Sequence, residues 1–142
     1  MKINIKKVTD ESGFDQALQL RYRVFVDEQG VPFELERDED DQKAEHILAQ
    51  YQGQTVGCGR ILFKNDYGKI GRVAVDKPYR VEGVGSKVCR ELIKIAEEKG
   101  CKKVVLHAQL DSKYFYKKLG FKITGDKFME AGIEHIKMVR DL

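Results

Sequence analysis

The segment from Lys69 to Ala108 constrains the fold of this chain more than any other part of the sequence. It predicts a strand at Lys69–Val75, a loop that contains a proline, a helix at Gly83–Lys99 and a buried strand at Lys103–Ala108. The apolar residues of the helix recur at intervals of three and four, and Gly100 follows as a terminator. A helix of this kind buries one face, so we expect it to cover a sheet that contains both strands.

The patterns on either side of this segment extend the sheet. Alternation predicts a first strand around Ile3–Val8, and helical spacing predicts a helix over Phe14–Val26. The remaining predicted elements are strands at His46–Tyr51 and Thr55–Phe63 in a hairpin, a short helix at Lys113–Leu119, and strands at Phe121–Phe128 and Ile133–Val139. The order β-α-β-β-β-α-β-α-β-β indicates an α/β (α+β) domain built on one mixed sheet.

Length and composition limit what this domain can be. A chain of 142 residues usually forms one domain, so we expect a single unit over residues 1–142. No apolar run reaches the roughly 18 residues of a membrane span, and the N-terminus lacks the apolar run of a signal peptide. We therefore expect a cytoplasmic protein with no membrane partner. The three cysteines and three histidines show no metal-ligand spacing, so no metal is expected.

Charge is distributed unevenly along the chain. The segment Asp27–Glu45 carries nine acidic and two basic residues, although the whole chain has a net charge of +3. Its part from Phe33 to Glu45 has no hydrophobic period and is predicted to be a long loop. An acidic loop on a basic domain suits one cationic and one anionic ligand, whereas the alternative is a solvated loop beside ordinary surface lysines. The acidic loop and the absence of a recognition-helix or base-stacking motif argue against a nucleic-acid partner.

The sequence Arg80-Val81-Glu82-Gly83-Val84-Gly85 lies where the predicted strand gives way to the helix. Glycines let the backbone approach a ligand, and the free N–H groups of a helix start bind phosphate. Two common phosphate motifs do not fit. A P-loop needs Gly-Lys-Ser/Thr where this chain has Gly85-Ser86-Lys87, and the dinucleotide fingerprint needs a glycine where Val88 stands.

The pattern R-x-x-G-x-G at Arg80–Gly85 resembles the pyrophosphate-binding motif of the GCN5-related N-acetyltransferases (GNATs), which bind acetyl-coenzyme A (acetyl-CoA). Phe115–Phe121 is similar to the second signature of the family, F-Y-x-x-x-G-F. Further blocks, among them Leu20–Phe33 and Gly132–Ile136, resemble the ElaA-like branch of the family. Together these blocks cover most of the chain.

This resemblance implies a fold, a co-substrate and a binding site. The fold would be a splayed, mostly antiparallel sheet of six to seven strands flanked by helices, in which Arg72–Val75 and Lys103–Ala108 part to admit the pantetheine arm. Acetyl-CoA would be the acyl donor, and the oxyanion would meet a backbone N–H near Val75. The residues expected at the cofactor are Val73, Val75, Arg80, Gly83, Val84, Gly85 and Ser86.

The implied reaction moves an acetyl group to the primary amine of a small, cationic acceptor by direct attack. Tyr116 matches the position of the family's general acid, although a tyrosine in an aromatic helix can also serve packing alone. An alkyl ammonium must lose a proton before it attacks, and Glu28, His46 and His135 are the candidate bases. Each of these three could instead be structural.

Two further questions stay open at the level of sequence. Arg21, Arg60 and Arg72 could order the acidic loop or bind a carboxylate of the acceptor, or could form ordinary surface ion pairs. The rival function is a non-catalytic acyl-CoA-binding or sensing module. The sequence does not fix the oligomeric state, and a homodimer would be common for the family.

Overall fold

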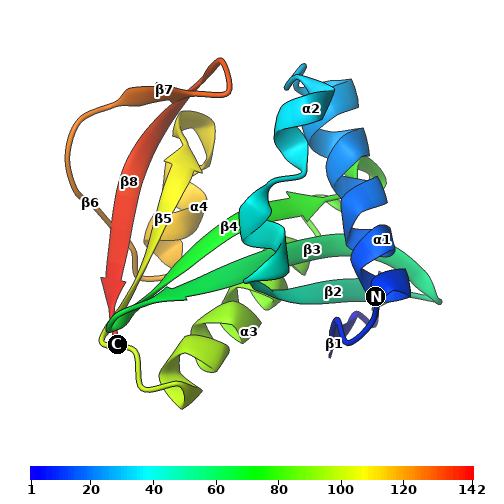
Figure 1. The fold of residues 1–142 in the computed structure, drawn as a ribbon, viewed down its shortest axis with the longest axis horizontal. Coiled ribbons are helices and arrows are strands. Elements are labelled where there is room, and N and C mark those ends of the chain that lie inside the picture. The colour runs from blue at the N-terminus through cyan, green and yellow to red at the C-terminus, as the bar shows by residue number, and fades with distance from the viewer.

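The computed structural model describes all 142 residues, and its eight strands form one sheet (Figure 1). The strand order is β1-β2-β3-β4-β5-β8-β6, with β7 paired to β8. Only β4 and β5 run parallel. The strands are β1 (Asn4–Lys7), β2 (Glu45–Tyr51), β3 (Gln54–Lys64), β4 (Tyr67–Val75), β5 (Lys103–Gln109), β6 (Lys122–Ile123), β7 (Phe128–Glu130) and β8 (Ile133–Asp141). The mixed, mostly antiparallel sheet is confirmed. It has one strand more than expected, because the strand predicted over Phe121–Phe128 divides into β6 and β7 around Gly125, whose φ is +95°.

Helices cover both faces of the sheet (Figure 1). They are α1 (Glu11–Arg21), α2 (Phe33–Glu36), α3 (Val84–Glu98) and α4 (Lys113–Lys118), with a π-helix η1 (Tyr22–Glu28) and short 3₁₀ turns η2 (Glu39–Gln42), η3 (Lys77–Tyr79) and η4 (Leu110–Ser112). The apolar stripe of α3 packs on one face, where Val88 and Leu92 are fully buried. Gly59 of β3 allows this contact, since a Cβ there would lie 2.8 Å from both side chains. Ala17 and Leu20 of α1 pack on the opposite face. None of the helices is long and apolar enough to cross a membrane.

Two local predictions are wrong in detail. The first helix begins at Glu11 rather than Phe14, because the Asp10 carboxylate accepts a hydrogen bond from the Gly13 N–H (2.9 Å) and caps it. It then continues as η1 to Glu28. The acidic segment Phe33–Glu45, predicted to be a loop, contains α2 and η2. Asp38 and Asp41 form a capping box at the start of η2, in which the Asp41 carboxylate accepts the Asp38 N–H (3.0 Å), and periodicity cannot reveal such a box.

β4 and β5 separate halfway along their length, as the family resemblance implies. Their parallel pairing covers Tyr67–Ile70 and Lys103–Leu106 and then stops. Just beyond that point β4 contains a bulge, in which Arg72 and Val73 together oppose Gly59 of β3, and Arg72 has a φ of +49°. A bulge bends its strand and increases the local twist. The bend therefore coincides with the place where the sheet opens.

Candidate active site

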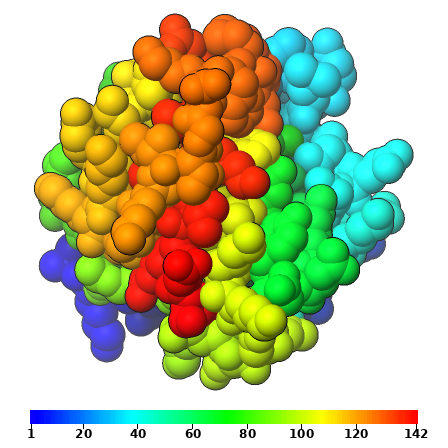
Figure 2. All heavy atoms as spheres, turned by 90° about the vertical axis from the view of Figure 1, so that its left-hand side faces the viewer, coloured from blue at the N-terminus to red at the C-terminus, as the bar shows by residue number.

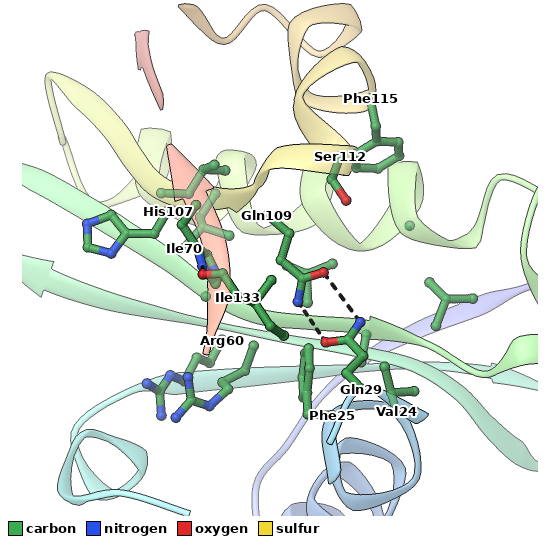
Figure 3. A pocket seen from close by; sticks show the side chains of 18 of the residues that line it. Val24, Phe25, Gln29, Arg60, Ile70, His107, Gln109, Ser112, Phe115 and Ile133 are labelled. Atoms are coloured by element: carbon green, nitrogen blue, oxygen red, sulfur yellow. Dashed lines mark hydrogen bonds between the residues drawn. The ribbon is translucent and has the colours of Figure 1, made fainter. Parts of the chain in front are cut away.

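A pocket of about 1090 Å³ occupies the opening between β4 and β5 (Figure 3). Val73 and Val75 of β4 and His107 and Gln109 of β5 line its opposite walls. In Figure 2 the strands β8, β5 and β4 and the acidic segment follow one another across one face, from red through yellow and green to cyan. The pocket extends from the start of α3 to the β7–β8 hairpin and the acidic segment. It is therefore long enough to bring a bound anion and a second ligand to one place.

The start of α3 forms one end of this pocket. Gly83 caps the helix with a φ of +81°, a conformation that side chains other than glycine rarely adopt. The N–H groups of Val84, Gly85 and Ser86 precede the Lys87 N–H, which donates the first helical hydrogen bond, to the Gly83 carbonyl (3.1 Å). All four residues from Gly83 to Ser86 line the pocket. The arrangement offers three backbone donors and the positive end of a helix dipole to a phosphate group.

Gly85 has a different function from Gly83. A Cβ on Gly85 would lie 3.2 Å from the Phe115 ring and 3.6 Å from a Val75 methyl group, whereas a Cβ on Gly83 would meet nothing within 4 Å. Gly85 thus lets the helix start pack against α4 and β4. Of these two glycines, Gly83 is the one that faces open space.

Arg80 holds the loop before α3 in place. Its Nε–H donates to the Val75 carbonyl (2.9 Å), and its terminal nitrogens form an ion pair with both oxygens of Glu28 (2.9 Å each). Arg80 lines the pocket, and Glu28 does not. The pair connects η1 to the end of β4, and it occupies the carboxylate that the sequence offers as one candidate base.

Tyr116 of α4 lies in the pocket wall and packs edge-on against Phe115 and Phe121. Burial raises the pKa of its phenol, and the nearby thiol of Cys89 raises it further. The phenol therefore stays protonated at neutral pH. A protonated phenol in this wall can donate a proton to a departing thiolate.

His135 is the one candidate base that lines the pocket. It lies on β8 opposite Gln109 of β5, and Phe128 stacks on its ring. Glu130, at the tip of the hairpin, approaches two imidazoles: its Oε1 lies 3.1 Å from His107 Nδ1 and its Oε2 lies 3.7 Å from His135 Nε2.

His46 lies outside the pocket, in the core beneath the acidic segment. Its Nε2 lies 2.9 Å from the Asp41 carbonyl oxygen, to which it donates a hydrogen bond, and its ring packs edge-on against Phe14. Burial lowers the pKa of His46, which keeps the ring neutral. The structure thus brings Tyr116 and His135 into one pocket and leaves Glu28 and His46 outside it.

Three arginines and three carboxylates form a network under the acidic segment. Arg21 pairs with Glu36 and Asp41 (2.8 Å each), Arg60 with Asp38 and Asp41 (2.7 Å each), and Arg72 with Glu36 (3.0 Å) and Asp38 (3.1 Å). Arg21, Arg60, Glu36 and Asp41 are buried. These arginines order the acidic segment, and their charges balance its buried carboxylates. The acidic segment therefore offers a cationic ligand far less charge than its sequence suggests.

Gln29 and Gln109 bridge the pocket. The Gln109 amide donates to the Gln29 carbonyl oxygen (2.7 Å) and the Gln29 amide donates in return (3.4 Å). Figure 3 shows this pair joining the residue after η1 to the end of β5, with Phe25 beside it. It connects β5 to the segment that follows η1.

Sequence reasoning missed Glu130, His107 and the bridging glutamines as pocket residues. One signal for Glu130 was available, since a hairpin turn at Ala131-Gly132 places Phe128, Glu130, Ile133 and His135 on the same face by the two-residue period of strands. No comparable signal exists for the contact between Gln29 and Gln109, which are 80 residues apart. No three His, Cys, Asp or Glu side chains are grouped so as to hold a metal ion.

Comparisons with known proteins agree with this geometry. The family model described as "Acetyltransferase (GNAT) domain" matches residues 7–142. The uncharacterized N-acetyltransferase YjcF of Bacillus subtilis (strain 168) is 39% identical over 142 residues, which is 99% of this chain and 100% of that protein. The crystal structure of Escherichia coli ElaA has a TM-score of 0.88 at 31% identity and covers 99% of this chain and 100% of its own. A GNAT family acetyltransferase from Elizabethkingia anophelis with acetyl-CoA bound shares the fold, with a TM-score of 0.75, 22% identity and coverage of 99% and 98%.

Proposed function

This chain belongs to the GNAT family of acetyl-CoA-dependent N-acetyltransferases, and we propose that it moves the acetyl group by direct attack to the primary amine of a small, cationic acceptor. One observation carries the proposal. The donor groups of the α3 start and the His135–Glu130 pair lie in the same pocket, at the place where β4 and β5 separate. Such a pocket can hold a thioester and an amine together, which converts a bimolecular reaction into an effectively unimolecular one.

The α3 start would bind the pyrophosphate through the backbone N–H groups of Val84, Gly85 and Ser86. The stretch of β4 from Gly71 to Val75 pairs with β3 but not with β5. Its backbone groups on the β5 side are therefore free, which suits a pantetheine arm lying between the two strands. A backbone N–H near Val75 would stabilise the oxyanion. Arg80 supports this site by holding the loop rather than by offering a free guanidinium.

In the chemical step, His135 would accept a proton from the acceptor ammonium. The neutral nitrogen then attacks the thioester carbonyl, the carbon–sulfur bond breaks, and the thiolate takes the phenolic proton of Tyr116. The new amide nitrogen loses its second proton, which restores the Tyr116 phenol. The location of both side chains in the pocket wall supports these assignments. The bidentate pairing of Glu28 and the buried hydrogen bond of His46 favour His135 over the other two candidate bases.

The test measures thiol release from acetyl-CoA with a panel of primary amines: butylamine, spermidine, kanamycin, tyramine and Nα-acetyl-lysine. We expect thiol release that depends on at least one of these amines. Calorimetric titration should show that CoA binds, whereas NAD and ATP should bind much more weakly. Tight binding of acetyl-CoA without release by any amine would instead indicate the non-catalytic acyl-CoA-binding module.

A further inference from the structure

The hydrogen bonding of His135 fixes which of its nitrogens can act as a base. Its Nδ1 lies 2.7 Å from the Ile133 carbonyl oxygen, which only accepts hydrogen bonds, so Nδ1 carries a proton. The neutral ring therefore has its lone pair on Nε2. That nitrogen points toward Glu130 Oε2 at 3.7 Å.

His107 fixes the other side of the same carboxylate. Its Nδ1 lies 3.1 Å from Glu130 Oε1 and must donate, because a carboxylate only accepts. Phe128 contacts both imidazoles, edge-on to His107 and stacked on His135. One carboxylate oxygen is thus held by a donor, while the second oxygen faces His135 Nε2, which carries a lone pair when the ring is neutral.

When the His135 ring is neutral, its Nε2 and the Glu130 carboxylate are two hydrogen-bond acceptors that face each other, and they need a donor between them or beside them. A primary ammonium carries three N–H donors and a positive charge, and it matches a carboxylate oxygen and an imidazole lone pair at once. Ile133, on the same face of the hairpin as Glu130 and His135, lines the pocket and offers apolar contact to the carbon chain of such an amine. The acidic segment contributes Glu36, Asp38 and Asp40 to the pocket, but the arginine network engages Glu36 and Asp38, so Asp40 is its one carboxylate there outside the network.

We propose that Glu130 Oε2 and His135 Nε2 form the binding site for the ammonium group of the acceptor, a proposal that rests on the proposed acetyltransferase function. The ammonium donates one hydrogen bond to each atom and then transfers one proton to His135 Nε2. Glu130 stabilises the resulting imidazolium, and the amine nitrogen uses the freed electron pair to attack the thioester. The pocket thereby selects amines that arrive as cations.

The test compares Glu130→Gln with Glu134→Gln. The change Glu130→Gln keeps an acceptor for the hydrogen bond from His107 but removes the charge, and the new amide can donate to His135 Nε2 and so occupy its lone pair. Glu134 lies on β8 next to His135 on the opposite face of the strand and is exposed, which makes it a matched control. We expect Glu130→Gln to raise the KM for the amine acceptor at least tenfold with an unchanged KM for acetyl-CoA, and Glu134→Gln to change neither. Equal acceptor KM values in the wild-type protein and Glu130→Gln would overturn the proposal.

A binding measurement separates this proposal from the proposed function. Nitrogen-15 spectra of the histidine side chains are recorded with CoA bound, while the same amines are added. We expect the His135 Nε2 signal to shift in the wild-type protein and in Glu134→Gln but not in Glu130→Gln. Shifts without turnover would overturn the proposed function and leave the ammonium site standing. Turnover with no shift, or a shift that Glu130→Gln preserves, would overturn the ammonium site alone.

Discussion

At the scale of single residues, the pocket shows how the surroundings of a side chain assign its chemistry. Tyr116 is kept protonated because its phenol is buried beside Cys89, among the rings of Phe115 and Phe121. Tyr114 lies two residues away on the same helix and is exposed to solvent, where Lys113 and Lys117 contact its ring. Burial therefore distinguishes the two tyrosines of this short helix: Tyr116 lies in the pocket wall and Tyr114 lies on the surface.

Tyr116→Phe removes the phenolic proton and keeps the aromatic packing. We expect turnover to fall by about ten- to a thousandfold, with CoA affinity and melting temperature nearly unchanged, because the change removes only the proposed general acid. Steady-state thiol release measures the first effect, and calorimetry measures the second. Tyr114→Phe is the matched control and should keep wild-type turnover. Full activity of Tyr116→Phe under conditions where chemistry limits the rate would reject Tyr116 as the acid.

His46 should make the stability of the protein depend on pH. Burial lowers its pKa in the folded state below the ordinary value of about 6.5, and protonation would also place a cation near Arg21 and Arg60. The unfolded chain therefore binds a proton at a higher pH than the folded chain does. The stability contributed by neutral His46 is complete above about pH 6.5 and is lost as the pH falls below that value.

The variant His46→Gln keeps a hydrogen-bond donor for the Asp41 carbonyl and removes the titration. We expect the wild-type protein to lose more unfolding free energy than this variant between pH 7.5 and pH 5.5, by up to about 1.4 kcal/mol per pH unit. Urea unfolding at both pH values measures the difference. The same pH dependence in the two proteins would show that His46 does not titrate in this way.

At the scale of elements, the bulge in β4 is stabilised by contacts from outside the sheet. Arg72 adopts a φ of +49°, a conformation that costs about 1–3 kcal/mol for a residue other than glycine. Its guanidinium pairs with Glu36 and Asp38 and donates to the Glu36 carbonyl. The acidic segment thereby helps hold β4 in the bent form that opens the pocket.

The start of α3 allows a matched test of cofactor binding. Gly83 and Gly100 flank the same helix, have φ values of +81° and +80°, and offer open space to a Cβ. Replacing either by alanine should lower the unfolding free energy by about 1–2 kcal/mol, because alanine is strained in this conformation. Only Gly83→Ala should also weaken CoA binding, by fivefold or more, since only Gly83 lines the pocket. Calorimetric titration of both variants checks this, and equal CoA affinities would place the pyrophosphate elsewhere.

At the scale of the whole molecule, the arginine network joins elements that are distant in the sequence. Arg21 ends α1, Arg60 belongs to β3 and Arg72 to β4, and all three meet on carboxylates of the acidic segment. Burial alone would raise the pKa of the Asp41 carboxyl, but hydrogen bonds from Arg21 and from the Asp38 backbone lower it well below its usual range. Asp41 therefore stays ionised at the centre of the network.

Asp41→Asn should destabilise the protein by about 3–5 kcal/mol at neutral pH, because it removes one of the two carboxylates that pair with each of the buried Arg21 and Arg60 guanidinium groups. Denaturant unfolding measures this loss, and Glu39→Gln, an exposed change in the same turn, should have almost no effect. The pKa of the Asp41 carboxyl is lower in the folded chain than in the unfolded chain. The stability that ionised Asp41 contributes is therefore complete above the unfolded pKa of about 3.9 and is lost as the pH falls further. The difference in unfolding free energy between the wild-type protein and Asp41→Asn should therefore become smaller below pH 4. A gap of less than 1 kcal/mol at pH 7 would contradict this role.

The sequence by itself determined the order of the main elements, the long helix α3 and the glycines at the start of that helix. These features depend on local periodicity and on glycines, which act over a few residues. Tertiary structure alone decided which candidate base enters the pocket, what the acidic segment does and where Gln29 meets Gln109. His46 and His135 look alike as sequence, yet one lies under α1 and η2 and the other beside Glu130. Burial and long-range pairing assign those functions, because they depend on where distant strands meet.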